Sequence, residues 1–278
     1  PPPPRRARRP PPFPPELAKA RASGVLTIAS VWAAHSLAVL RALSTGAVPA
    51  GPPEPPAPLP LVALHMRECL LDPPALAELL AAARGGVLAR VRVLDVSGCW
   101  LRDYEELLDE VCSRCGEADG GLQKLALEHC DVTRLPRVAQ GVSLSGLLEL
   151  RASYNPLQGD GCLGVLAQQR LGALRVLHLA GCELGASDAQ AIANSLGGPA
   201  CQLRSLDLDD NPGFGATGAH ALATLLRGCG ELETLTLEYC DLDASAAAEV
   251  LGACSLLRSL SAVSLHGNAL PAADAVMR

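Results

Sequence analysis

Eight rows of eleven residues with the same pattern of apolar and polar positions recur along residues 61–278. In each row the first, fourth, sixth and eleventh positions are apolar, and the ninth is Cys or Asn. The rows, numbered 1 to 8, begin at Leu61, Val91, Leu122, Leu147, Leu174, Leu203, Leu232 and Leu260. Alternation of apolar and polar residues predicts a short strand in each row, and the Ala- and Leu-rich segments between rows predict helices.

The apolar positions of the rows are expected to form one continuous core, because a single strand and helix cannot bury their apolar faces alone. The fourth position supplies its central ladder, Leu64, Leu94, Leu125, Leu150, Leu177, Leu206, Leu235 and Val263. The ninth position holds small side chains with polar capacity, Cys69, Cys99, Cys130, Asn155, Cys182, Asn211, Cys240 and Asn268. These side chains are predicted to satisfy backbone groups from inside, where the chain turns away from the strand.

The row pattern resembles the leucine-rich repeat family, and the long unit with a Cys/Asn position and a full helix is similar to the ribonuclease-inhibitor-like class. The resemblance covers about residues 61–278. It implies an α/β solenoid, a horseshoe of about eight repeats with a concave parallel sheet and convex helices. For function it offers inhibitors, receptor sensor domains, regulators of small GTPases and structural subunits, and it does not choose among them.

Three places depart from the pattern. Between rows 3 and 4 the spacing shrinks to 25 residues, and Pro136 and Gly141 predict an irregular convex segment there. In row 6 Gly213 replaces the last leucine, so Phe214 is expected to fill the space. The sequence stops at Arg278, soon after row 8, and a cap, further residues or a partner is expected to cover that end.

Composition divides the chain before row 1. Residues 1–24 contain six basic residues and one acidic residue, a net charge of +5, so the rest carries −11 of a total of −6. Sixteen of the 23 prolines lie in the first 60 residues. We therefore divide the chain into a basic Pro/Arg-rich arm (1–24), an N-terminal capping helix region with a Pro-rich linker (25–60) and the repeat domain (61–278). Within 25–60, VLTIAS predicts a strand and WAAHSLAVLRALSTG a helix.

No catalytic, cofactor-binding or metal-binding residue is predicted. The G-x-G-x-x-G motif of Gly213–Gly218 lacks the doubly wound sheet that a dinucleotide site needs, and its glycines fall where the units turn. Cys112 and Cys115 form a lone C-x-x-C, whereas a zinc site needs four ligands. The eleven cysteines show no framework spacing, which favours an intracellular, reducing compartment. Cytoplasm or cytoskeleton is expected, with the mitochondrion as the alternative.

The candidate binding surface lies on the concave face and its rim, because the fifth, seventh and eighth positions of each row point there. Rows 6 and 7 make that face acidic, and two of the three tyrosines share the rim column. The candidate residues are Asp207, Asp209, Asp210, Glu233, Glu238, Tyr154, Tyr239, His178 and Arg151. A partner with a basic surface is expected. Equally, these charges could simply be solvated.

The resulting hypothesis is a non-enzymatic scaffold, a structural subunit of a larger cytoskeletal or organellar assembly. It would bind a protein partner through the concave face and the open C-terminal end, as part of a hetero-oligomeric complex. The alternative is an organellar RNA-associated subunit of ribosomal type, with nucleic acid contacted only by Arg5, Arg6, Arg8 and Arg9 of the arm. Binding to a membrane is not expected.

Overall fold

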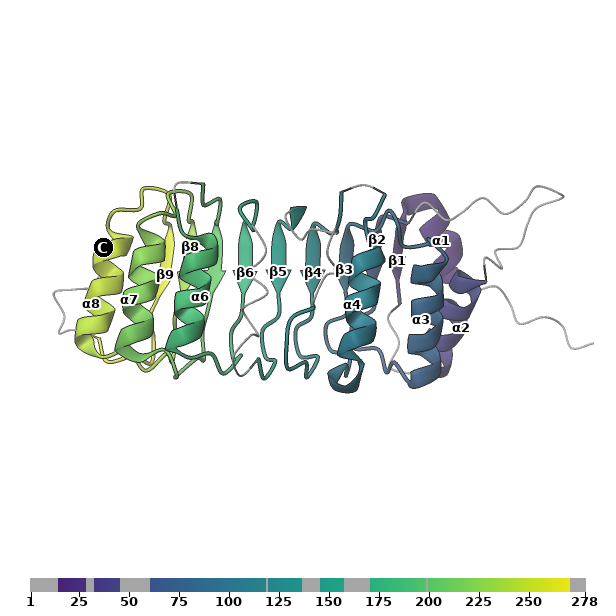
Figure 1. The fold of residues 1–278 in the computed structure, drawn as a ribbon, viewed down its shortest axis with the longest axis horizontal. Coiled ribbons are helices and arrows are strands. Elements are labelled where there is room, and N and C mark those ends of the chain that lie inside the picture. Colours follow the sequence, from purple (N-terminus) through teal and green to yellow (C-terminus); the bar gives the residue numbers. More distant parts are fainter. Residues whose placement is uncertain are drawn as a thin grey trace, which may run out of the picture.

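The computed structural model describes residues 15–28, 33–45, 61–118, 120–136, 146–157, 171–198 and 200–270. Within them, nine strands form one parallel sheet in the order of the sequence (Figure 1). The strands are β1 (Val25–Thr27), β2 (Ala63–His65), β3 (Val93–Asp95), β4 (Lys124–Ala126), β5 (Glu149–Arg151), β6 (Val176–His178), β7 (Ser205–Asp207), β8 (Thr234–Thr236) and β9 (Ala262–Ser264). Rows 1 to 8 supply β2 to β9, so the predicted parallel solenoid is confirmed.

Helices line one face of the sheet (Figure 1). In the described ranges they are α1 (Pro15–Ser23), α2 (Ala33–Ser44), α3 (Pro73–Arg84), α4 (Glu105–Arg114), α6 (Ala186–Leu196), α7 (Gly215–Leu226) and α8 (Ala244–Cys254), with a short 3-10 turn at Arg102–Tyr104. Asp72 caps α3, since its Oδ1 accepts a hydrogen bond from the Ala75 N–H at 3.0 Å. None of these helices has the length and apolar character that crossing a membrane requires. The sheet face opposite the helices is called the concave face.

The fourth-position ladder lies at the centre of the core. Strand pairing places Leu26 beside Leu64 and continues in register to Leu235 beside Val263. The leucines of this ladder are buried. Phe214 is also fully buried, which confirms that it fills the space left by Gly213.

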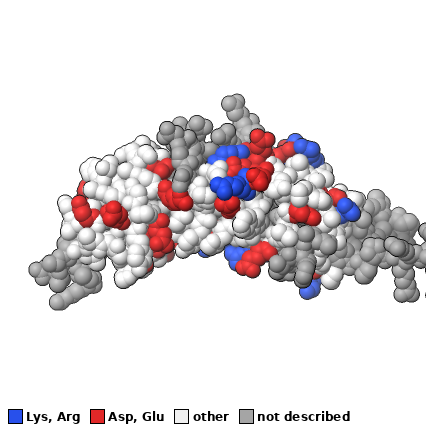
Figure 2. Space-filling view, turned by 90° about the horizontal axis from the view of Figure 1, so that it is seen from below, with Lys and Arg blue, Asp and Glu red and all other residues white. Residues whose placement is uncertain are grey.

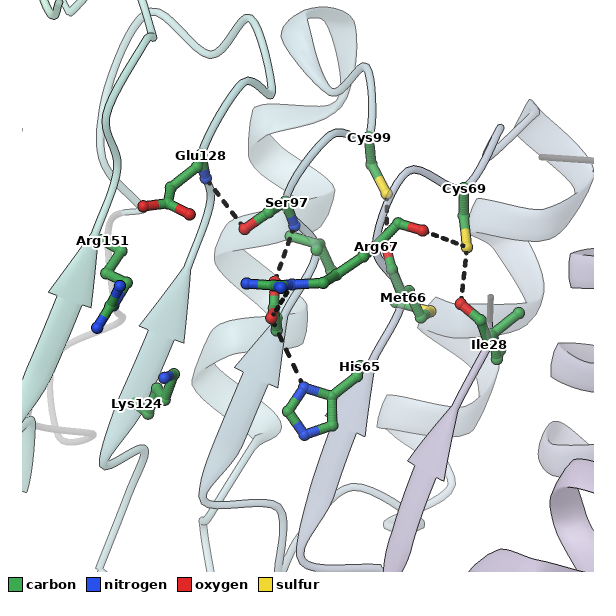
Figure 3. Close-up of polar contacts among 12 residues, drawn as sticks. Ile28, His65, Met66, Arg67, Cys69, Ser97, Cys99, Lys124, Glu128 and Arg151 are labelled. Carbon is green, nitrogen blue, oxygen red and sulfur yellow. Dashed lines mark hydrogen bonds and ion pairs between the residues drawn. The ribbon is translucent and has the colours of Figure 1, made fainter. Parts of the chain in front are cut away.

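The ninth-position side chains satisfy the backbone of the preceding unit, as predicted. Asn211 is buried; its Oδ1 accepts from the Cys182 and Leu184 N–H groups at 3.2 and 3.0 Å. Its Nδ2 donates to the Leu179 and Leu208 carbonyls, both at 2.9 Å. Asn155 and Asn268 repeat this pattern. The ninth-position cysteines each donate to one carbonyl of the preceding unit, as the Cys99 Sγ does to Met66 O at 2.9 Å (Figure 3).

The sheet begins earlier than row 1. β1 comes from the region 25–60 and pairs with β2 in the register of all later strands, so this region supplies a ninth repeat-like unit and more than a capping helix. The predicted strand and helix there correspond to β1 and α2. Within the arm, α1 is folded, and its Leu17 and Ala20 are buried in the core. Arg5, Arg6, Arg8, Arg9 and the linker prolines of 46–60 lie outside the described residues.

After β4 the chain forms no helix over residues 131–136, and residues 137–145 lie outside the described ranges. Arg134 fixes this turn to α4, since its two terminal nitrogens donate to both carboxylate oxygens of Asp109 at 2.9 and 2.8 Å. The irregular convex segment expected at Pro136 is therefore present in its first part, whereas Gly141 lies beyond it.

Candidate protein-binding surface

The rim of the concave face is built by the eighth position of each row, which always has a left-handed backbone. The φ angles lie between 52° and 75° for Glu68, Gly98, His129, Tyr154, Gly181, Asp210, Tyr239 and Gly267. This conformation disfavours residues other than glycine. In rows 1 to 7 the eighth N–H donates to the seventh carbonyl of the next row, as Tyr154 does to Ala180 at 2.6 Å. These bonds hold the rim side chains in the same place in every unit.

Tyr154 and Tyr239 both lie in this rim column, and each is about half exposed, 48% and 49%. The Tyr154 ring stacks on His129, with centroids 4.4 Å apart and planes 8° from parallel. On its other side it contacts Gly181 of row 5, where a Cβ would lie 2.7 Å from the Tyr154 Cδ1. The ring of Tyr239 meets His266 edge to face, with centroids 5.5 Å apart. Both tyrosines are thus held in place by their neighbours, and about half of each side chain remains exposed.

Four carboxylates, Asp207, Asp209, Asp210 and Glu238, form the acidic patch at the ends of β7 and β8. Asp207 Oδ1 accepts from the Thr236 hydroxyl at 2.9 Å, and Asp209 Oδ1 accepts from the Glu238 N–H at 2.7 Å. Among the described residues, no Lys or Arg forms an ion pair with any of the four. Burial, and after it the charges of Asp207 and Glu238, raises the pKa of Asp209. The ionised carboxylate of Asp209 therefore lowers the stability of the folded state.

The acidic patch lies next to Tyr154. Partial burial and the negative charges of Asp210, Asp207 and Asp209 raise the pKa of the Tyr154 hydroxyl. Because this ring covers Gly181, it reaches from row 4 across row 5 towards row 6, where those aspartates lie. Two features chosen separately from the sequence, the rim tyrosine and the acidic residues, form one surface.

Glu233 does not belong to the acidic patch. It precedes β8 whereas Glu238 follows it, so the two are about 16 Å apart along an extended chain. Glu233 lies 3.5 Å from the Arg204 guanidinium, which also contacts Glu231 at 3.4 Å. Its negative charge is therefore offset locally.

In the N-terminal half of the concave face, acidic and basic groups neutralise each other. The buried carboxylate of Asp95 accepts from the Arg67 Nε at 2.7 Å, and its other oxygen accepts from the Ser97 N–H at 3.1 Å. Burial alone would raise the pKa of Asp95, but the hydrogen bonds from Ser97 and the charge of Arg67 outweigh it and lower the pKa. Figure 2, which views the molecule from below and not onto the concave face, shows blue and red groups side by side in the middle and red groups in its left, C-terminal part.

Arg151 and His178 lie between these two halves. Arg151 is paired with Glu149, which also accepts from the Lys124 Nζ at 2.9 Å. His178 is half-buried, and its Nε2 lies 3.0 Å from the Ser205 hydroxyl oxygen. Burial, followed by the charge of Arg151, lowers the pKa of His178, so at neutral pH it adds no positive charge. Both residues are tied to neighbours, and they offer a partner less than Tyr154 does.

Two exposed apolar side chains on the same edge of the sheet are not among the residues predicted from the sequence. Trp100 is 74% exposed and Leu70 is 56% exposed. Both occupy the tenth position, which is a large apolar residue only in rows 1 and 2 of the eight. A comparison of that column across the rows would have identified them as a possible contact.

The two motifs set aside in the sequence serve packing in the structure. Gly213 lies so close to the preceding unit that a Cβ would be 2.7 Å from the Leu184 carbonyl oxygen. Gly218 faces Phe214 within α7. Cys112 and Cys115 are buried, and burial raises the pKa of both thiols. Within the described ranges, no three His, Cys, Asp or Glu side chains converge as metal ligands would.

Comparisons with known proteins agree with this geometry. A family model described as "Leucine Rich repeat" matches residues 174–193 and 201–223. Ribonuclease inhibitor from Sus scrofa is 33% identical over 158 residues, which is 54% of this chain and 34% of that protein. The chain thus spans about a third of the curated relative. The crystal structure of an internalin from Listeria monocytogenes superposes with a TM-score of 0.51 at 15% identity, covering 78% of this chain and 64% of that one.

Proposed function

Since this chain is a leucine-rich repeat protein of the ribonuclease-inhibitor-like class, we propose that it is a non-enzymatic scaffold that binds a protein with a basic surface. Proteins of this family generally mediate protein–protein interaction and are typically not enzymes. The acidic patch and Tyr154 together are the proposed contact surface. The observation that carries the proposal is the cluster of four carboxylates, which repel one another and with which no Lys or Arg of the described residues forms an ion pair.

A basic partner would relieve this repulsion. A Lys or Arg side chain placed between Asp207 and Asp210 would pair with carboxylates whose neighbours are also negative, so the gain exceeds that of an ordinary surface ion pair. The exposed part of Tyr154, about half of its side chain, offers the same partner an aromatic contact. Long-range attraction would also speed association at low ionic strength.

The wider role that we propose is that of a structural subunit of a cytoskeletal or organellar assembly in a reducing compartment, cytoplasm first and mitochondrion second. The eleven cysteines of the sequence support such a compartment, since they show no framework spacing. A second contact is proposed at the C-terminal end of the solenoid. Leu256 and Leu270 support it, because they are 67% and 46% exposed.

The test is crosslinking with affinity purification from the native source. The intact protein is compared with a variant carrying Asp207→Lys, Asp209→Lys and Glu238→Lys. The matched control carries Asp103→Lys, Glu106→Lys and Glu117→Lys, which changes the net charge equally at exposed positions between rows 2 and 3. We expect one partner to crosslink to rows 4 to 7 and to be lost only from the patch variant. If the partner persists and crosslinks elsewhere, the patch is not the site.

The alternative, an RNA-associated subunit, is favoured only by the charge of +5 in residues 1–24. Here RNA would contact the arm arginines, and its affinity would fall steeply with salt. The deletion that tests this removes residues 1–14, because α1 begins at Pro15 and buries Leu17. Salt-dependent RNA binding that disappears with this deletion supports the alternative, and unchanged binding excludes the arm as its site.

A further inference from the structure

Two cysteine sulfurs meet on the segments that lead from the helices back into the sheet. Cys201 precedes β7 and Cys229 precedes β8, and their Sγ atoms are 2.6 Å apart. Cys229 is buried, whereas Cys201 is only partly buried. This contact plays no part in the proposed binding surface.

The fold brings these sulfurs together because the two segments are in close contact. A Cβ built on Gly228 would lie 3.0 Å from the Gly198 nitrogen, so the backbones touch just before each cysteine. The strands that follow pair Ser205 with Thr234. Paired strands lie about 4.8 Å apart, and a disulfide needs its α-carbons at about 4.4–6.8 Å. A bond between these sulfurs therefore requires little backbone movement.

The two thiols are also unequal in acidity. The hydrogen bond between the two sulfurs, in which either thiol can be the donor, lowers the pKa of Cys201 to about 7. The same hydrogen bond, followed by burial, raises the pKa of Cys229. By contrast, burial raises the pKa of Cys240 to about 12 and that of Cys254 to about 11. Cys201 thus has the character of an attacking thiol and Cys229 that of a resolving thiol.

We propose that Cys201 and Cys229 are a reversible thiol–disulfide site that reacts with low-molecular-weight disulfides such as glutathione disulfide. The Cys201 thiolate attacks one glutathione sulfur, forming a mixed disulfide and releasing one glutathione thiolate. Cys229 then loses its proton to water and attacks the Cys201 sulfur, which releases the second glutathione. The protein is oxidised by two electrons, and glutathione disulfide is reduced to two thiols. Excess glutathione reverses both steps.

Closure of this site would link the units that carry the acidic patch. Cys201 and Asp207 lie at opposite ends of β7, and Cys229 and Glu238 lie at opposite ends of β8. The disulfide would therefore fix the separation of the two strands from the edge opposite to the patch.

The experiment equilibrates the full-length chain in glutathione buffers of increasing oxidised fraction, then quenches with acid and alkylates the remaining thiols. Peptide mass spectrometry should show a peptide pair joined through Cys201 and Cys229, with Cys240 and Cys254 alkylated only after unfolding. With a thiol reagent at pH 7, Cys201 should react about three- to fivefold faster than an ordinary thiol, because its larger thiolate fraction outweighs the lower nucleophilicity of a thiolate with a lowered pKa. Failure to link these two residues at any glutathione ratio would overturn the proposal.

Variants separate the two roles. Cys229→Ser should accumulate glutathione on Cys201, because the resolving thiol is missing, and Cys201→Ser should take up none at Cys229. The matched control, Cys254→Ser, removes a buried thiol of a neighbouring unit and should still form the link. Preferential attachment of glutathione to Cys229 in Cys201→Ser would contradict the assigned order.

Discussion

The ring of Tyr154 lies directly against the α-carbon of Gly181, where a Cβ would come within 2.7 Å of the Tyr154 Cδ1. The glycine also has a φ of 59°. Gly181→Ala should therefore destabilise the fold by about 1–2 kcal/mol through backbone strain and should displace the tyrosine ring. Urea unfolding measures the first effect, and partner crosslinking the second.

The control for this substitution is Gly230→Ala. Gly230 has open space at its Cβ position and lacks a positive φ. The free energy of unfolding of the Gly230→Ala variant should stay within about 0.5 kcal/mol of that of the unsubstituted protein. Equal effects of the two substitutions would show that neither the left-handed backbone of Gly181 nor its contact with Tyr154 adds a cost.

The same Asp→Asn change should have opposite effects at two positions of the concave face. The pKa of Asp95 is lowered in the fold, so its ionised form stabilises the protein above about pH 4, and this contribution is lost as the pH falls through the lowered value. The pKa of Asp209 is raised, so its ionised form is a penalty that disappears on acidification. At pH 7 Asp95→Asn should cost about 1–3 kcal/mol, and Asp209→Asn should stabilise by less than about 1 kcal/mol.

Denaturant unfolding from pH 3 to pH 8 measures both differences. The loss in Asp95→Asn should shrink below pH 4, and the gain in Asp209→Asn should shrink over the range below neutrality. A stabilised Asp209→Asn that also loses its partner would identify the carboxylate as kept for binding at the expense of stability. If Asp209→Asn destabilises the protein at pH 7, the ionised Asp209 does not destabilise the fold through its acidic neighbours.

Asn211→Ala should be among the most damaging single substitutions. It leaves the Cys182 and Leu184 N–H groups and the Leu179 and Leu208 carbonyls without their partner inside the core. A loss of about 3 kcal/mol or more is expected from several unsatisfied buried groups. Thermal and urea unfolding measure it.

Two comparisons test the cause of that loss. Asn211→Cys should cost less than Asn211→Ala, because cysteine is the native residue at this position in neighbouring rows and its thiol reaches a carbonyl, as in Cys182 to Ala152 at 3.2 Å. Asn194→Ala, at an exposed position of α6, should change stability little. Equal losses for Ala and Cys at position 211 would mean that hydrogen bonding is not the cause.

Much of the fold could be predicted from the rows, because the equivalent apolar positions of successive rows stack on one another in the core. The ladder from Leu64 to Val263, the buried Phe214 and the inward ninth side chains are all present. β1 was missed as a sheet strand because its unit departs from the row pattern. Counting back from Leu26, Ser23 occupies the first position, and the Pro-rich segment lengthens the step to Leu64 to 38 residues. Pairing between strands tolerates a serine at the first position and a longer step to the next strand. A search for the eleven-residue row pattern tolerates neither.

The candidate surface was harder to predict, because a row gives the direction of a side chain but not its partners. The charge of Asp210 in row 6 acts on the Tyr154 hydroxyl of row 4, and the glycine of row 5 leaves room for the ring between them. Glu233 was grouped with the acidic residues by proximity in sequence, yet the strand carries it to the opposite edge, beside Arg204. Whether the acidic patch binds a partner stays a prediction.

The ninth-position side chains make each unit of the solenoid depend on the unit that follows it in the sequence. Asn155, Asn211 and Asn268 all complete the backbone of the unit before their own. The ninth-position cysteines likewise reach backwards, as Cys99 does to Met66. Each unit is therefore finished by its successor and not by its predecessor. Duplicating or excising one whole unit preserves this order, whereas a cut between a strand and the following ninth residue leaves the earlier unit incomplete.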